Sequence, residues 1–169
     1  MFSAATVPTS PPGCTALVIA GGRGLEAVLA DVWVLQHLPA ASSADGGGDP
    51  FVWRHLTEME LPHPRCAHAS ACVPGSSDLL VCGGFTGMGI AEDVIAARVR
   101  PGDNGLEAAQ GWRPVEASQP IGGRFGHCMA STCADLTTAA EGAVEGVLLF
   151  GGIDAVNDYN DMWALTDFL

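Results

Sequence analysis

Three apolar runs in this chain end in Gly-Gly, and an aspartate follows each pair at the same distance. Counted from the second glycine, the aspartate comes nine residues later each time. The three marks are Gly21-Gly22 with Asp31, Gly83-Gly84 with Asp93, and Gly151-Gly152 with Asp161. Equal spacing at three places along one chain indicates an internal repeat, which restricts the fold to architectures that stack one structural unit.

A second set of residues repeats with its own spacing. In two places a tryptophan precedes an arginine by twelve residues and a histidine by fifteen. These residues are Trp53, Arg65 and His68, and then Trp112, Arg124 and His127. The two spacings interleave, so one repeat unit is about sixty residues long.

The apolar runs and the segments after each aspartate are predicted strands. Residues 17–20, 79–82 and 147–150 are apolar without helical periodicity, and Gly-Gly ends each run. In the segments after the aspartates, alternation separates two sets of side chains, which are Trp33, Ile95 and Trp163 on one face and Val32, Val94 and Met162 on the other. Apolar residues on both faces predict a sheet that is covered on both sides. Ile95 takes the place of a tryptophan, so we expect looser packing in the middle unit.

The combination of Arg-x-x-His, an apolar run with Gly-Gly, Asp-x-Trp and a later Trp resembles the kelch repeat. The resemblance extends from Ala16 to the end of the chain. It implies an all-β fold of kelch-type β-propeller blades, each a four-stranded antiparallel meander with its first strand innermost. The expected organisation is an irregular segment over 1–15, a partial blade over 16–56, a full blade over 65–115 and a partial blade over 124–169.

The expected blades form an incomplete ring. Ten predicted strands make about three blades, whereas propellers close with four to eight. The chain is therefore either part of a larger propeller, which we favour, or it closes with another chain. Open blade faces would also allow self-association, because they leave apolar surface and strand edges unpaired.

Composition excludes several functional classes. Nineteen acidic residues against seven arginines and no lysine give a net charge of −12, which disfavours nucleic acid as a partner because phosphate binding needs clustered cations. We expect no membrane segment, because the longest apolar run, residues 16–20, is too short to cross a bilayer. The N-terminus lacks the basic segment of a secretory signal. The six cysteines show no C-x-x-C motif, so we expect reduced thiols and a cytoplasmic protein.

The connections at one end of the predicted blades are long and acidic. They cover 39–50, 101–111 and 134–146 and contain no arginine. Their acidic residues are Asp45, Asp49, Asp103, Glu107, Asp135, Glu141 and Glu145. Two interpretations remain open: solvated insertions of no consequence, or a loop face that meets a basic protein surface.

Candidate catalytic and metal-binding residues are better explained by packing. His63, Cys66, His68 and Cys72 lie close in sequence, as zinc ligands do, but alternate residues of a strand face opposite ways. The recurrence of histidine and arginine in two units favours structural roles, because a joint is needed in every blade and a catalytic residue only once. We therefore predict no catalytic residue, no metal site and no cofactor.

The resemblance implies a protein–protein interaction scaffold or adaptor whose partner is a protein of unknown identity. The alternative is a fragment of a kelch-fold enzyme whose active site lies on blades outside this chain. The residues predicted to build the repeat are Gly21, Gly22, Asp31, Trp33, Trp53, Arg65, His68, Gly83, Gly84, Asp93, Trp112, Arg124, His127, Gly151, Gly152, Asp161 and Trp163.

Overall fold

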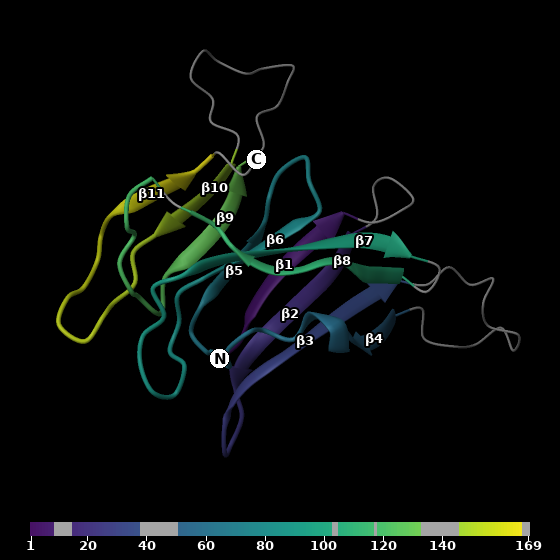
Figure 1. The fold of residues 1–169 in the computed structure, drawn as a ribbon, viewed down its shortest axis with the longest axis horizontal. Helices are drawn as coiled ribbons and strands as arrows, with labels where there is room; N and C mark the ends of the chain where they lie inside the picture. The colour runs from purple at the N-terminus through teal and green to yellow at the C-terminus, as the bar shows by residue number, and fades with distance from the viewer. Residues whose placement is uncertain (9–14, 38–50, 103–104, 117, 133–145, 167–169) are drawn as a thin grey trace, which may run out of the picture.

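The computed structural model describes residues 1–8, 15–37, 51–102, 105–116, 118–132 and 146–166. This part of the chain is built from strands and one short 3₁₀ helix, η2 (Thr57–Met59), and contains no α-helix (Figure 1). The predicted all-β class is thereby confirmed. Among these residues there is no helix with the length and apolar character that crossing a bilayer requires.

The strands form three antiparallel sheets, and each sheet is a meander in which successive strands are neighbours. The first sheet contains β1 (Ser3–Pro8), β2 (Thr15–Arg23), β3 (Val28–His37) and β4 (Phe51–His55). The middle sheet contains β5 (Ala69–Cys72), β6 (Asp78–Cys82), β7 (Val94–Gly102) and β8 (Gly105–Pro114). The third sheet contains β9 (Cys128–Thr132), β10 (Gly146–Phe150) and β11 (Met162–Leu165).

Strand β1 corrects the expectation of an irregular segment over 1–15. Residues 3–8 pair with β2, and Ser3 lies opposite Ala20 in the same register that places Ala69 opposite Cys82. The first sheet therefore has four strands rather than three. By this register, Phe2 occupies the position of His68, so the histidine of the Arg-x-x-His motif could not mark β1.

The three sheets pack face to face, with the middle sheet between the other two. Its innermost strand, β5, contacts β1 on one side and β9 on the other. One apolar core joins Val34 of the first sheet to Val81 of the middle sheet. A second core joins Leu80 of the middle sheet to Leu149 of the third. Adjacent residues of β6 therefore face opposite cores, as strand alternation requires.

Ile95 is not loosely packed, contrary to expectation. Its side chain is 6% exposed in the core between the first and middle sheets, whereas Trp33 at the matching place in the first sheet is 37% exposed. The difference comes from position in the stack and not from residue type. The middle sheet is covered on both faces, while the first and third sheets are covered on one.

The first two Gly-Gly pairs, Gly21-Gly22 and Gly83-Gly84, lie at joints between sheets. The first glycine has a positive φ, +53° at Gly21 and +58° at Gly83. A Cβ added at Gly21 would lie 2.6 Å from the Arg65 carbonyl oxygen, and one at Gly83 would lie 2.4 Å from the Arg124 carbonyl oxygen. Only glycine permits both this conformation and this approach of the next sheet's backbone.

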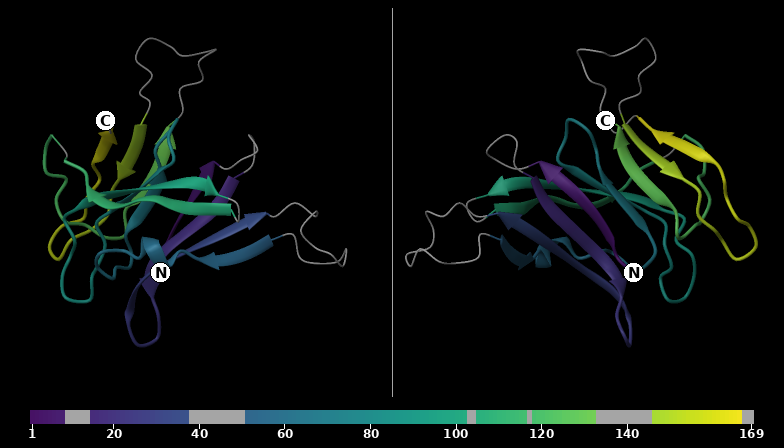
Figure 2. Two further views of the ribbon diagram at one scale, coloured as in Figure 1. Left: turned by 45° about the vertical axis from the view of Figure 1, so that its right-hand side comes forward. Right: turned by 180° about the vertical axis from the view of Figure 1, so that it is seen from behind.

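The amide of the second glycine completes the joint. Gly22 N donates to Arg65 O at 2.8 Å, and Gly84 N donates to Arg124 O at 2.8 Å. Each sheet is thus hydrogen-bonded to the segment that enters the next one. The hairpins β2–β3, β6–β7 and β10–β11, which follow these glycines, project toward the same end of the molecule (Figure 2).

The predicted long loop over 101–111 is largely a strand hairpin. β7 continues to Gly102 and β8 begins at Gly105, so the prediction of an irregular connection is wrong there. Pairing between the two strands includes Arg100 opposite Glu107. The other two predicted loops, 39–50 and 134–146, lie outside the described residues apart from Gly146.

Replacing Gly83 by alanine tests the joint. Gly83→Ala places a Cβ against the Arg124 carbonyl at a positive φ, so we expect the free energy of unfolding to fall by about 2–4 kcal/mol. Urea unfolding followed by tryptophan fluorescence measures the change. The matched control is Gly89→Ala, because a Cβ there meets nothing within 4 Å. Equal stability of the two variants would contradict the joint.

Candidate interaction site

The buried arginines hold the turns of their own sheets together. Arg65 is wholly buried, and its guanidinium donates to both carboxylate oxygens of Asp93 at 2.7 and 3.0 Å. The same group donates to the Gly83 carbonyl at 3.1 Å. The side chain of Arg65 therefore ties the Gly-Gly turn to the start of β7, while its carbonyl receives the hydrogen bond from Gly22.

Arg124 repeats this arrangement in the third sheet. Its guanidinium donates to Asp161 at 2.6 and 3.1 Å and to the Gly151 carbonyl at 3.0 Å. The ring of Tyr159 packs over the guanidinium, with its centroid 4.2 Å away. The same contacts with an aspartate and a glycine carbonyl occur at both arginines, so both guanidinium groups serve to hold their own sheets together.

Tryptophan side chains complete the same turns. Trp163 Nε1 donates to Asp161 at 2.7 Å, and Trp33 Nε1 donates to Asp31 at 2.7 Å. The Asp-x-Trp pattern thus places the indole over the carboxylate two residues earlier. Trp112 instead donates to the Met59 carbonyl at 2.9 Å, while Trp53 on the edge strand β4 is 49% exposed.

The two repeated histidines lie between sheets. His68 Nε2 lies 2.6 Å from the Ser3 hydroxyl oxygen of the first sheet, and His127 occupies the matching place beside the middle sheet. Burial lowers the pKa of His68 to about 4, and the positive charge of Arg65 acts in the same direction. Burial and Arg124 likewise lower the pKa of His127 to about 4. Both rings are therefore neutral near pH 7.

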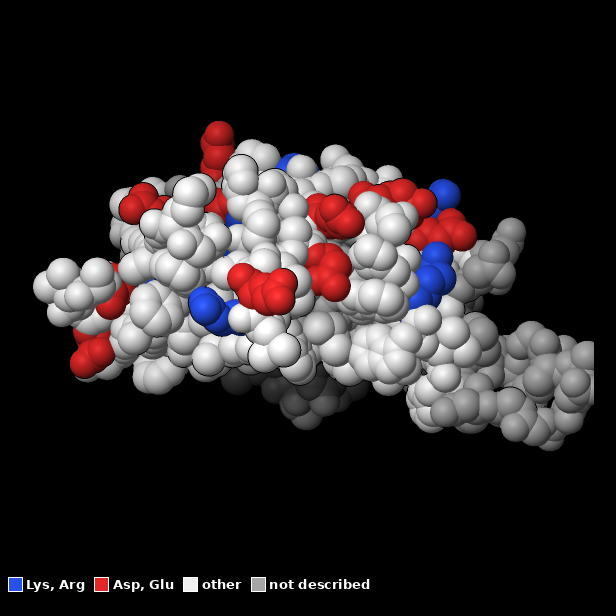
Figure 3. All heavy atoms as spheres, turned by 90° about the horizontal axis from the view of Figure 1, so that it is seen from below, with Lys and Arg blue, Asp and Glu red and all other residues white. Residues whose placement is uncertain are grey.

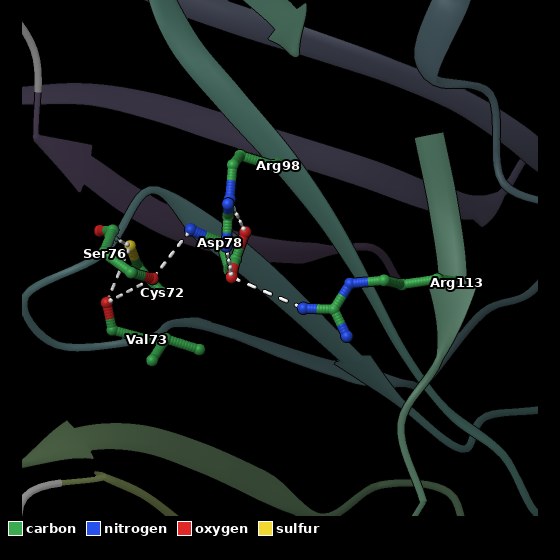
Figure 4. Close-up of polar contacts among 6 residues, drawn as sticks. All are labelled: Cys72, Val73, Ser76, Asp78, Arg98 and Arg113. Atoms are coloured by element: carbon green, nitrogen blue, oxygen red, sulfur yellow. Dashed lines mark hydrogen bonds and ion pairs between the residues drawn. The ribbon is translucent and has the colours of Figure 1, made fainter. Parts of the chain in front are cut away.

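A charged cluster at the opposite end of the middle sheet was missed by the sequence analysis. Asp78 is 3% exposed, and Arg98 donates to both of its carboxylate oxygens at 2.7 and 2.8 Å (Figure 4). Arg113 adds an ion pair at 3.5 Å, and these contacts lower the pKa of Asp78. Asp78 lies opposite Arg98 on β7, so counting the register back from Gly-Gly could have found the pair.

Two guanidinium groups share one carboxylate in this cluster, so it carries a net positive charge. Arg98 remains 51% exposed and Arg113 34% exposed, which makes both available to solvent and to a partner. The cluster is anchored by the neighbouring turn, where Asp78 N donates to the Ser76 hydroxyl oxygen at 3.0 Å. The end of the sheet that was predicted to be uniformly acidic therefore also presents arginine.

The innermost strands line an open groove of about 250 Å³. Its walls carry small side chains from β1, β5 and β9, among them Thr6, Ser70 and Ser131. Cys72 also lines it, but burial and the nearby Asp78 raise the pKa of this thiol to about 11. The protonated thiol is a poor nucleophile at neutral pH, so the groove offers small polar and apolar contacts.

Of the seven acidic residues predicted for the loop face, the structure describes Glu107. It lies in β8 and not in a loop, and its carboxylate is 3.7 Å from the Arg100 guanidinium. The remaining six, Asp45, Asp49, Asp103, Asp135, Glu141 and Glu145, lie outside the described residues. On the face seen from below in Figure 3, acidic side chains are spread among uncharged ones, with a few arginines between them.

The cysteines and histidines considered as metal ligands do not converge. Within the described ranges, no group of three or more His, Cys, Asp or Glu side chains is arranged to hold a metal ion. Cys66, Cys72 and Cys82 are buried free thiols, and Cys128 is an exposed one. Burial raises the pKa of Cys82 to about 12, consistent with a small apolar residue in the core.

No protein-family model matches this chain, and no curated protein matches it significantly. The kelch resemblance therefore remains a prediction that rests on the residues themselves. The structure adds three antiparallel sheets compatible with propeller blades.

The buried histidines predict loss of stability in mild acid. In the unfolded chain they bind protons near pH 6.5, whereas in the folded chain they do so only near pH 4. The unfolded state is thus favoured as the pH falls from 6.5 to 4, by about 1–3 kcal/mol for each histidine. The carboxylates Asp78 and Asp161 have pKa values lowered from 3.8, so their contribution is lost only below this window.

Urea unfolding at several pH values between 7 and 4 measures this effect. We expect the variants His68→Gln and His127→Gln each to remove part of the pH dependence, and the double variant to remove most of it. His63→Gln is the control, because His63 is exposed. An unchanged pH dependence in the double variant would refute the assignment.

Proposed function

We propose that the three sheets are consecutive blades of a kelch-type β-propeller and that the chain serves as a protein–protein interaction scaffold. Support comes from the order of the strands. In every sheet the first strand is innermost and contacts the first strand of the neighbouring sheet, and the later strands follow outward. This order of strands is compatible with blades arranged around an axis.

The main support for the proposal is that the polar side chains of the repeat are already engaged in packing and hydrogen bonds within the protein. Arg65, Arg124 and His68 are buried and bonded within or between sheets. Among the described residues, these polar side chains therefore stabilise the joints between sheets and do not line a cavity as a catalytic set would. A rigid stack that presents variable connections at one end is suited to holding partner proteins.

The partner class follows from charge. The chain has a net charge of −12, and seven acidic residues were predicted at the end where the Asp78 cluster lies. A partner with a basic surface fits the acidic residues, and its own carboxylates fit Arg98, which is 51% exposed. We assign this mixed charged end of the sheets as the binding face.

Neutralising acidic residues at the two ends of the sheets tests the binding face. The chain is used to capture partners from cell extract, and a captured protein is then purified and titrated against variants. The loop variant is Asp45→Asn, Asp49→Asn and Glu141→Gln; the control is Glu26→Gln, Glu58→Gln and Asp158→Asn, three exposed residues outside those loops. Both triple variants change the charge by the same amount.

We expect the loop variant to weaken binding roughly tenfold and to flatten its dependence on salt, because exposed charges act through screened Coulomb attraction. The control should bind like the unmodified chain. Equal losses in both variants, or no loss in either, would count against this binding face. Failure to capture any protein would count against the scaffold itself.

A further inference from the structure

Within the described residues, the first and third sheets each pack against another sheet on one face, and the opposite face is apolar. On the first sheet this face consists of Leu17, Ile19, Trp33 and Leu35, which we call the Trp33 face. On the third sheet it consists of Leu148, Phe150, Met162 and Ala164, which we call the Met162 face. Trp33 is 37% exposed and Met162 is 66% exposed. At the edge of the Trp33 face, Asp31 accepts a hydrogen bond from Trp33 Nε1 at 2.7 Å and the His55 ring stacks on Trp33 at 4.8 Å. The side chains of both sets are apolar, so covering either face would lower the free energy of the protein in water.

Register shows what covers the Trp33 face elsewhere in the molecule. Its four positions correspond to Leu79, Val81, Ile95 and Ala97 of the middle sheet. All four of those side chains are buried in the core against the first sheet. A face of the Trp33 type is therefore covered, in this molecule, by the sheet that precedes it in the chain.

The Met162 face has the opposite relationship. Its four positions correspond to Leu80, Cys82, Val94 and Ala96 of the middle sheet. Those side chains are buried in the core against the third sheet. A face of the Met162 type is thus covered by the sheet that follows it, which presents a face of the Trp33 type.

The chain consequently carries both halves of an interface that it already forms twice internally. We propose that a second copy of the chain covers these faces, with the Met162 face of each copy packed on the Trp33 face of the other. The two contacts are related by a twofold axis, as in most closed homodimers. The resulting stack has six sheets, which lies within the four to eight at which propellers close.

Phe2 is placed to contact the second copy at the proposed interface. By the register of β1 and β5, Phe2 occupies the place of His68, whose ring packs beside Gly21 of the preceding sheet. His127 packs beside Gly83 in the same manner. Phe2 is 57% exposed. In the dimer it lies beside Gly151 of the second copy, and this contact replaces a buried histidine with an apolar ring.

A single chain cannot make this contact with itself. The Trp33 and Met162 faces lie on the two outer sheets, and the middle sheet separates them. The three sheets of the described residues are also fewer than the smallest closed propeller contains. The inference rests on the propeller arrangement proposed above but not on the proposed binding face, so dimerisation and partner binding can fail separately.

The oligomeric state in solution is the first test. Light scattering after size-exclusion chromatography should give the mass of two chains at high concentration and of one chain on dilution. The tryptophan emission should shift to the red on dilution as Trp33 becomes solvated. A monomer at every concentration would overturn the proposal, and so would a ladder of larger assemblies, which indicates a head-to-tail contact that does not close.

Two single variants distinguish this pairing from any other dimer. Trp33→Asp and Met162→Asp alter different faces, so each variant alone spoils both contacts of its homodimer and should be monomeric. Mixed together, they restore one intact contact, between the Met162 face of the first variant and the Trp33 face of the second. We expect the mixture to form dimers and circular dichroism to show that both variants are folded.

The control is Leu25→Asp, which adds the same charge at a fully exposed apolar residue in the β2–β3 hairpin, outside both faces. It should dimerise like the unmodified chain. Dimers that persist in both single variants would overturn the proposal, as would a mixture that remains monomeric. The mass of the unmodified chain is informative even if a variant fails to fold, because it requires no substitution.

Discussion

The buried guanidinium groups of Arg65 and Arg124 are the interaction on which the rest of the structure depends. Burying a cation is costly unless its donors are satisfied. The terminal nitrogens of each arginine meet a bidentate carboxylate and a glycine carbonyl, while the buried Nε of each has no hydrogen-bond partner among the described residues. These partners lie in the connection between the second and third strands of one sheet. The side chain therefore sets the geometry of a whole turn.

The backbone of the same arginines sets the distance between sheets. The carbonyl of Arg65 accepts from Gly22, and the carbonyl of Arg124 accepts from Gly84. A residue that organises its own sheet thus also binds the preceding one. This double role explains why the glycines, the aspartates and the arginines recur together, since moving one of them would break contacts within and between sheets.

The sequence predicted the parts of the fold that this joint determines. Strands β2, β6 and β10 are marked by Gly-Gly, and their partners are marked by the aspartates. β1 was missed because Phe2 stands where the motif has histidine, and the β7–β8 hairpin was missed because proline and glycine suggested a loop. The packing of Ile95 depends on the neighbouring sheet, which no local pattern encodes. The pairing of Asp78 with Arg98 depends on strand register, which can be counted back from Gly-Gly.

Both proposals concern surfaces that the packing of the sheets leaves open. The joint uses the polar residues of the repeat and leaves apolar faces and one charged end for contacts with other chains.

Amide hydrogen exchange, resolved by residue, tests the joint most directly. The amides of Gly22 and Gly84 should be strongly protected, because each donates across a joint. Gly152, at the same place in the third sheet and without an acceptor for its amide among the described residues, should exchange much faster. Equally fast exchange at all three glycines would contradict the account.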